Sequence, residues 1–224
     1  MTDDKKILEH AEVDEGVNEV MLYTFTGKHL DLLTLKEDDI DVEDIAHALS
    51  MQCRYNGHIR KFYSVAEHCV LLSRYVLSHP IHGKASYANQ LAAVMLMHDA
   101  SEAYIGDMVY HLKKSMYAFE VLEEFILDKV RHTFTVDFSL EDGKIEGKAY
   151  LQKPYLILEQ LVHALDRSAS VDEMDEMHPG GVDPVLYEMG CKPLGLKFHY
   201  WTPEQAKKEF LDMYNQLGIK KETL

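Results

Sequence analysis

The sequence predicts an all-α protein, a bundle of helices with at most a small β-hairpin near the N-terminus. Apolar residues recur at helical spacing in several long segments. Residue types that cap helix N-termini stand directly before several of these segments. The extended pieces, by contrast, are short and lie near the beginning of the chain. We therefore expect one domain over residues 1–224, with no linker that divides it.

The first third of the chain combines a short helix, a turn and two extended pieces. Asp41 is positioned to cap a helix over residues 42–50. Residues 54–58 contain an Asn-Gly pair, which favours positive φ and so predicts a turn. Extended pieces are expected at residues 20–25 and around 61–63, where they are candidates for the hairpin.

The longer helices begin at recognisable start signals. Ser64 and Glu67 match a capping box, which opens a helix that continues to about residue 79. Further helices are predicted over residues 87–104, 114–134, 155–177 and 202–218. Residues 1–19 are expected to be a loose N-terminus, and residues 178–201 an irregular segment rich in glycine and proline.

The charge excludes one class of function. The chain has 23 lysines and arginines against 38 aspartates and glutamates, a formal net charge of −15. A duplex nucleic-acid binder needs many basic contacts to phosphates, so this class is disfavoured. A small phosphorylated substrate remains compatible, provided that a metal ion and a few local cations offset the repulsion.

The sequence also points to the cytoplasm. The longest purely apolar run covers residues 91–97, far too short to cross a membrane, and the N-terminus lacks the apolar core of a secretory signal. The three cysteines show no CxxC spacing, so we expect neither a disulfide framework nor a zinc knuckle.

Four side chains on three predicted helices point inward. His68 and Asp166 each lie on an apolar helical stripe, and His98-Asp99 follows the apolar run directly. Taken singly, each has an ordinary explanation: an inward histidine is usually a satisfied core residue, and a buried aspartate usually pairs with an arginine. Together, two imidazoles and two carboxylates form a ligand set suited to zinc, manganese, cobalt, nickel or iron(II).

The order of these residues resembles a known signature. His68, then His98-Asp99, then Asp166 is similar to the H…HD…D pattern of HD-domain metal-dependent phosphohydrolases. Residues 98–107 resemble the deoxynucleotide-directed branch, which includes bacterial 5′-deoxynucleotidases and phage dATP triphosphohydrolases. The resemblance covers about residues 26–173, and three upstream segments are similar to the phage- and prophage-borne members: residues 44–50, 54–58 and 62–68.

The resemblance implies a role for each matching residue. His68, His98, Asp99 and Asp166 would hold one divalent transition metal, with Zn, Mn or Co expected first and Ni or Fe as alternatives. Arg54 matches the arginine that clamps the substrate phosphate in this branch. Two further candidate phosphate contacts do not rest on the resemblance: Lys113, with a solvated surface lysine as its alternative, and His58, for which an ordinary turn histidine is the stronger alternative.

The catalytic base is expected to be Glu102 or Asp107, because each stands in a position that the resemblance assigns to proton transfer. A metal-activated water would attack the α-phosphorus of a deoxynucleotide. The upstream segments favour a deoxynucleoside triphosphate, with dATP first, and a 5′-deoxynucleotidase acting on monophosphates is the alternative.

Two other classes stay open, an HD-fold iron oxygenase and a non-catalytic nucleotide sensor. The presence of both candidate bases argues against the sensor, since ligand binding alone does not require them. The resemblance further implies a homo-oligomer, located in the cytoplasm of the host if the protein is phage-encoded.

Overall fold

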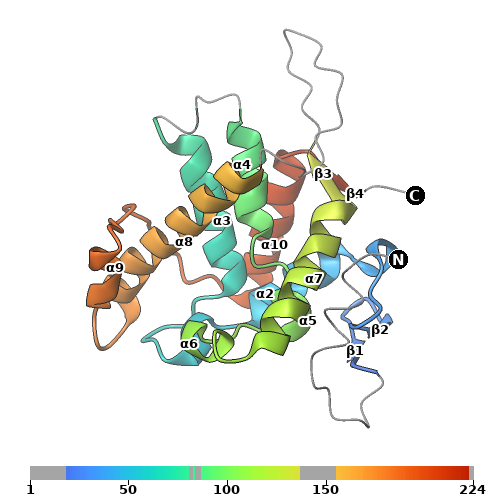
Figure 1. Ribbon diagram of the computed structural model, residues 1–224. Coiled ribbons are helices and arrows are strands. Elements are labelled where there is room, and N and C mark those ends of the chain that lie inside the picture. The colour runs from blue at the N-terminus through green and yellow to red at the C-terminus, as the bar shows by residue number, and fades with distance from the viewer. Residues whose placement is uncertain (1–18, 81–82, 84–86, 137–154, 222–224) are drawn as a thin grey trace, which may run out of the picture.

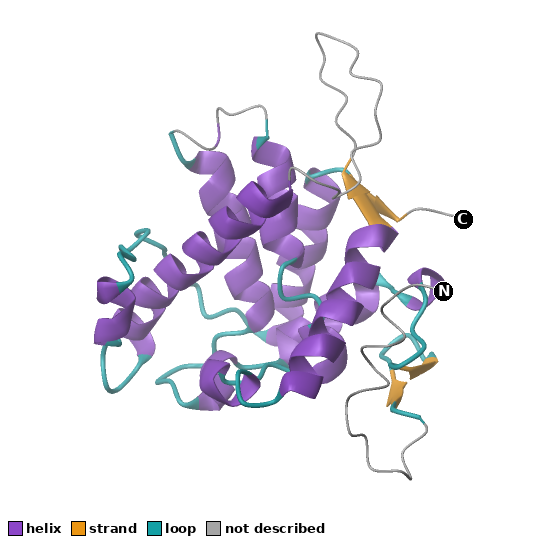
Figure 2. Ribbon diagram, viewed as in Figure 1, coloured by secondary structure: helices purple, strands orange, loops and turns teal. Residues whose placement is uncertain are grey.

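A computed structural model describes residues 19–80, 83, 87–136 and 155–221, and these residues form a mostly helical protein (Figure 2). The predicted all-α class is thereby confirmed, together with a small two-stranded antiparallel hairpin near the N-terminus. The predicted loose segment 1–19 falls outside the described residues except for its last position. None of the described helices combines the length and the apolar character that a membrane crossing requires.

The elements follow one another as short strands, then helices, then a last short strand. In chain order they are β1 (Met21–Tyr23), β2 (His29–Asp31), the 3-10 helix η1 (Glu37–Asp39), α2 (Val42–Met51), the 3-10 helix η2 (Arg54–Gly57), α3 (Val65–Ser78), α4 (Ala88–Met97), α5 (Glu102–Ile105), α6 (Tyr110–Lys113), α7 (Tyr117–Thr133), β3 (Phe134–Val136), α8 (Tyr155–Met177), α9 (Pro184–Glu188), α10 (Pro203–Gln216) and β4 (Ile219–Lys221).

The centre of the bundle is formed by α3, which packs against α4 and α10 (Figure 1). The predicted inward face of α3 is confirmed, because Val65, Leu72 and Val76 are fully buried. Helix α8 crosses in front of α3 and α4 in Figure 1 and packs against both. This crossing brings residues from the second half of the chain onto the end of α4.

Three helices begin where side-chain caps predict. The Asp41 carboxylate accepts a hydrogen bond from the backbone N–H of Glu43 (3.0 Å) at the start of α2. The Ser64 hydroxyl accepts one from Glu67 (3.1 Å) at the start of α3. Helix α10 starts at Thr202 with a complete capping box and a proline in its first turn. Each cap satisfies a backbone donor that the helix itself leaves free.

The predicted continuous helix over residues 87–104 is wrong. Helix α4 ends at Met97, residues 98–101 form turns, and the short α5 follows. Backbone hydrogen bonds in the interruption span three residues, as from Glu102 N–H to Asp99 O (3.0 Å), instead of the four of an α-helix. The predicted helix over residues 114–134 likewise begins later, at Tyr117, after the separate turn of α6.

The strand pairing also differs from the prediction. The hairpin joins β1 to β2, with Leu22 opposite Leu30, and residues 61–63 are not its second strand. A tight two-strand pair needs only the short connection between residues 23 and 29, whereas the predicted partner would have had to cross α2. A second pair, β3 with β4, joins the end of α7 to the chain after α10.

The predicted irregular segment 178–201 contains one short helix, α9, and is otherwise without regular structure. Two carboxylates attach it to the bundle. Both oxygens of Glu67 accept hydrogen bonds from the backbone N–H groups of residues 199–201 at 2.7–3.0 Å. Asp172 of α8 accepts three more from residues 194–196. The predicted capping box at Glu67 is therefore only half formed, because its side chain serves this distant loop.

Candidate metal centre

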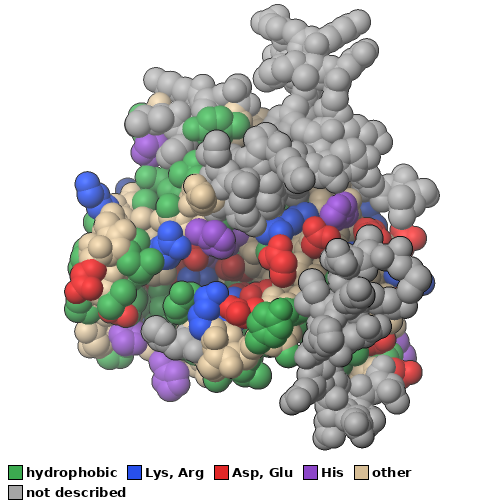
Figure 3. Space-filling model, in the orientation of Figure 1, with side chains coloured by type: hydrophobic (Ala, Val, Ile, Leu, Met, Phe, Trp, Pro, Cys, Tyr) green, Lys and Arg blue, Asp and Glu red, His purple; other side chains and the backbone are tan. Residues whose placement is uncertain are grey.

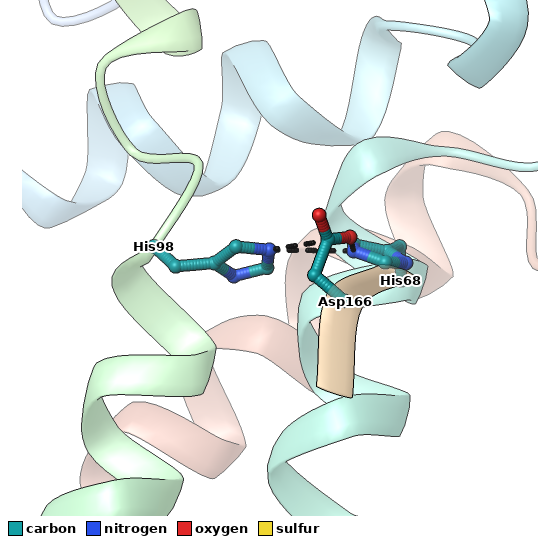
Figure 4. Close-up of side chains that lie close together, drawn as sticks. All are labelled: His68, His98 and Asp166. Carbon is teal, nitrogen blue, oxygen red and sulfur yellow. Dashed lines mark hydrogen bonds and ion pairs between the residues drawn. The ribbon is translucent and has the colours of Figure 1, made fainter. Parts of the chain in front are cut away.

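Three side chains from three helices converge at one point (Figure 4). His68 comes from α3, His98 from the end of α4 and Asp166 from α8. The Nε2 atom of His68 lies 3.1 Å from Oδ1 of Asp166 and 3.4 Å from Nε2 of His98. The His98 Nε2 atom lies 3.9 Å from the same Asp166 oxygen. Residues almost a hundred positions apart therefore present their polar atoms to a common centre.

Asp99 completes the group. Its Oδ1 atom lies 3.3 Å from His98 Nε2, and its Oδ2 atom lies 3.8 Å from His68 Nε2. Consecutive residues of a regular helix point about 100° apart and cannot readily share a target. The end of α4 immediately before them removes this restriction, so that His98 and Asp99 both reach the centre. The structure brings together all four side chains predicted as metal ligands.

The second ring nitrogen of each histidine is fixed by another group. The Nδ1 atom of His68 lies 2.6 Å from Oε1 of Glu173, and that of His98 lies 2.8 Å from the backbone carbonyl of Met95. A carbonyl only accepts hydrogen bonds, so the His98 Nδ1 must carry the proton. In the neutral rings the lone pairs of both Nε2 atoms then face the common centre, as in metal-binding histidines.

The buried charges at the centre shift one another's pKa values. Burial opposes the charged form of His98, but the Asp99 charge, together with Cys69 and the hydrogen bond to Asp166, outweighs it and raises the pKa of His98 well above its usual value. Burial acts against charge on Asp166 as well, yet hydrogen bonds from His68 and His98 lower the pKa of Asp166 well below its usual value. The cluster thus attracts positive charge, which protons or a cation can supply.

Arg54 lies beside this cluster, on η2. Its Nη1 atom is 3.5 Å from Asp99 Oδ2 and its Nη2 atom is 3.8 Å from Asp166 Oδ1. Shorter contacts join it to Glu173, at 3.2 Å through Nη2 and 3.3 Å through Nε. The predicted turn at residues 54–58 is confirmed, with positive φ at Tyr55 (56°) and Asn56 (50°). The turn brings the Arg54 guanidinium next to the predicted ligands.

Glu173 is a site residue that the sequence reasoning missed. It is fully buried and contacts both His68 and Arg54. A signal was present, since Glu173 follows Asp166 by seven residues, two turns of the same helix and hence the same face. A second acid on the face of a predicted ligand is a candidate for holding a histidine in place.

Of the two predicted bases, Glu102 is the first residue of α5 and Asp107 follows the end of this helix. Glu102 is buried, and burial followed by the charges of Asp99 and Asp107 raises its pKa well above the usual value. Burial is also the largest cause of the raised pKa of Asp107. The side chain of Gln52 connects the two, because its amide donates to the Glu102 carbonyl (2.8 Å) and accepts from the Asp107 N–H (2.9 Å).

The two remaining predicted phosphate contacts are less directly placed. Lys113 forms an ion pair with Glu123 of α7 at 2.6 Å. His58 is exposed, and its backbone N–H donates to the carbonyl of Tyr55 (2.9 Å). The contacts between the four converging side chains include neither residue.

A second possible donor group shares the same histidine. Sγ of Cys69 lies 3.9 Å from Nδ1 of His98, which makes Cys69, His98 and Asp99 a geometrically possible metal set. Burial raises the pKa of the Cys69 thiol to about 11, so this sulfur is protonated near neutral pH. Because metals bind the thiolate, the set of two histidines and two aspartates is chemically preferred.

The surface around the site is hollowed. In Figure 3, acidic, basic and histidine side chains gather around a depression in the middle of the face shown, and the labels of Figure 1 locate it between α8 and α6. Arg54 and Asp99 keep 13% and 17% of their side-chain surface exposed, and Asp166 keeps 33%. Part of the cluster is therefore exposed to solvent.

Fold and site together define a mostly helical protein in which two histidines and two aspartates meet beside an arginine. No family model matches the chain. It is similar to the uncharacterized protein YfdR of Escherichia coli, with 39% identity over 111 residues, 50% of this chain and 56% of that protein. It is also 39% identical over 94 residues to an uncharacterized Rhodobacter capsulatus protein, covering 41% of this chain and 45% of that one. The chain thus spans about half the length of these relatives.

Proposed function

We propose that this protein is a divalent-metal-dependent phosphohydrolase of the HD-domain type that acts on deoxynucleotides. One observation carries the proposal. The Nε2 atoms of His68 and His98 meet the Asp166 carboxylate within 3.9 Å, while the Nδ1 atom of each ring is already occupied by another group. Two imidazoles whose Nδ1 atoms are held by other groups, and whose Nε2 atoms converge on carboxylates, have the arrangement of metal-binding histidines.

The donor distances fit a metal ion. Two ligands that each lie about 2.1 Å from a tetrahedral ion are roughly 3.4 Å apart. The separations among the donor atoms of His68, His98 and Asp166 range from 3.1 to 3.9 Å, and the two Asp99 oxygens lie 3.3 Å from His98 Nε2 and 3.8 Å from His68 Nε2. Nitrogen and carboxylate oxygen donors suit Zn, Mn or Co, and also Ni or Fe(II). When bound, such an ion polarises a phosphoryl oxygen and supplies a water-derived nucleophile near neutral pH.

The other residues of the site would act on the phosphate and on protons. Arg54 holds its guanidinium beside Asp99 and Asp166, where a phosphate oxygen carried by the metal would meet it. Glu102 is buried and its pKa is raised above the usual value, the direction expected of a carboxyl group that exchanges protons. Asp107, with a raised pKa as well, is the alternative base.

The substrate assignment rests on sequence resemblance. Residues 44–50, 54–58, 62–68 and 98–107 resemble enzymes that act on deoxynucleotides, and the upstream segments favour a deoxynucleoside triphosphate, dATP first. Water would attack the α-phosphorus and release the deoxynucleoside and triphosphate. A 5′-deoxynucleotidase would use the same attack on a monophosphate. We further propose, from the resemblance alone, a cytoplasmic homo-oligomer.

The test is incubation of the protein with pooled deoxynucleotides and Mn²⁺, Co²⁺ or Zn²⁺, followed by separation of phosphate, pyrophosphate and triphosphate. Triphosphate release supports the first substrate class, and phosphate release from monophosphates supports the 5′-deoxynucleotidase. The variant His98→Ala should lose activity. His132→Ala is the matched control, because His132 is exposed and bonds Asp128 of its own helix.

Metal bound without turnover on any deoxynucleotide would instead support the sensor, and oxygen consumption with iron would support the oxygenase. Either result would contradict the hydrolase proposal.

A further inference from the structure

Glu173 contacts both a predicted metal ligand, His68, and the predicted phosphate contact, Arg54. It lies on α8 with no exposed side-chain surface, and both of its oxygens are used. Oε1 lies 2.6 Å from Nδ1 of His68. Oε2 accepts from the Tyr55 hydroxyl at 2.7 Å and from Arg54 at 3.2 and 3.3 Å. A buried carboxylate with this set of donors is stable in its charged form only while the donors keep their positions.

The Oε1 atom of Glu173 positions the predicted metal ligand His68. Its hydrogen bond keeps the proton of His68 on Nδ1 and fixes the ring plane, which directs Nε2 toward Asp166. Glu173 and Asp166 stand on the same face of α8, two turns apart. One rigid helix therefore supplies a metal-ligand candidate and the group that orients a second.

The Oε2 atom of Glu173 positions the predicted phosphate contact Arg54. Arg54 belongs to η2, a turn with positive φ at its next two residues, so its long side chain needs an anchor outside its own segment. Glu173 supplies it through two N–H groups on one edge of the guanidinium. The contacts to Asp99 and Asp166 are longer, 3.5 and 3.8 Å.

The contact with Glu173 also limits how closely Arg54 can pair with Asp99 and Asp166. If Glu173 were absent, the nearest carboxylates left to Arg54 would be those of Asp99 and Asp166. Closer pairing with them would take electron density from two metal-ligand candidates and would also occupy the guanidinium that a phosphate needs. Loss of Glu173 should thus weaken both binding events through one side chain.

We propose that Glu173 is a positioning residue that couples metal binding at His68 to phosphate binding at Arg54. This inference rests on the proposed function, since it takes His68 as a metal ligand and Arg54 as the phosphate contact. It goes further in assigning both binding events to one buried carboxylate that touches neither the metal nor the substrate.

The test measures two affinities in the full chain. Mn²⁺ binding is measured by calorimetry on the metal-free protein, and inorganic phosphate binding is measured at saturating Mn²⁺. Glu173→Gln should weaken Mn²⁺ binding about 10- to 100-fold, the usual cost of losing a group that orients a ligand. Phosphate binding at saturating Mn²⁺ should fall at least about tenfold, because a hydrogen bond to a charged group is lost.

The control is Asp172→Asn on the neighbouring position. Asp172 accepts three backbone hydrogen bonds from residues 194–196, so this variant should be less stable with both affinities unchanged. Glu173→Asp provides a second variant that keeps the charge but is too short to reach both partners. It should weaken both affinities in the same direction, and it keeps the test decisive if Glu173→Gln fails to fold.

The outcomes separate the two proposals. Wild-type protein that binds no divalent metal would overturn the proposed function itself. Wild-type binding with unchanged affinities in the folded Glu173 variants would overturn only the positioning role. Weaker Mn²⁺ binding with unchanged phosphate binding would also overturn it, because Glu173 would then act on His68 alone.

Discussion

Glu102→Gln separates the chemistry of the site from its assembly. Glu102 is 6% exposed, and its Oε2 atom has no hydrogen-bond partner among the described residues. Burial, then the charges of Asp99 and Asp107, raise its pKa well above the usual value. Glutamine has nearly the same shape but no charge, so the change removes an electrostatic cost without creating a cavity.

The stability of the metal-free protein should respond with a definite sign. A raised pKa means that the folded state binds more protons than the unfolded state between the two pKa values, so wild-type stability falls as the pH rises through that window. The Glu102→Gln variant should not show this fall in stability with rising pH, because glutamine does not titrate. An unsatisfied buried polar group costs roughly 1–3 kcal/mol, and a charged one more. At alkaline pH the variant should therefore be more stable than wild type by at least about 1 kcal/mol.

Turnover should change in the opposite direction. Removal of a general base lowers the rate about 10²- to 10⁴-fold, while Mn²⁺ affinity should stay within about twofold. Urea denaturation at acidic and alkaline pH gives the stability, and phosphate release gives the rate. Glu188→Gln is the matched control, because Glu188 is exposed on α9. A variant less stable than wild type at alkaline pH would refute the stability reasoning. A rate loss below about tenfold would transfer the base role to Asp107.

Three further predictions concern residues around the site. Asp99→Ala should weaken Mn²⁺ binding by at least about 100-fold in calorimetry while the far-ultraviolet circular dichroism is retained, and an unchanged affinity would remove Asp99 from the ligand set. Glu67→Gln should lower the free energy of unfolding by about 3 kcal/mol in urea, because residues 199–201 lose a charged acceptor, and a loss below about 1 kcal/mol would contradict this. Gln52→Leu should reduce turnover at least about tenfold with Mn²⁺ affinity unchanged, because the Glu102 carbonyl and the Asp107 N–H lose the side chain that bonds both. Undiminished turnover would show that these two hydrogen bonds are not needed for catalysis.

The sequence predicts best those features that depend on neighbouring residues. The helices capped by Asp41, Ser64 and Thr202 begin where expected, because a cap and the backbone donor it satisfies lie within three residues of each other. The turn after Cys53 is similarly local, since its Asn-Gly pair favours positive φ. Even the convergence of the distant ligand candidates could be anticipated, because their order along the chain resembles a known signature.

Features that depend on distant partners were missed. Neither proline nor glycine interrupts residues 88–105, so no local signal marks the end of α4 before His98. Glu67 matches a capping box, yet the N–H groups of residues 199–201 hold its carboxylate more favourably than its own helix does. Glu173 shows the same difficulty, because periodicity gives its face but not the histidine and arginine that it meets there.

The position of α8 has a consequence for local unfolding. Helices α2, α3, α4 and α10 pack on one another, whereas α8 lies across α3 and α4 and carries Asp166 and Glu173. Local detachment of α8 would leave most of the hydrophobic core in place while dispersing the acidic groups around His68. A cation that binds the closed form alone would then hold α8 down, with a strength that grows with cation concentration. Ion occupancy and the docking of one helix would thus be a single equilibrium.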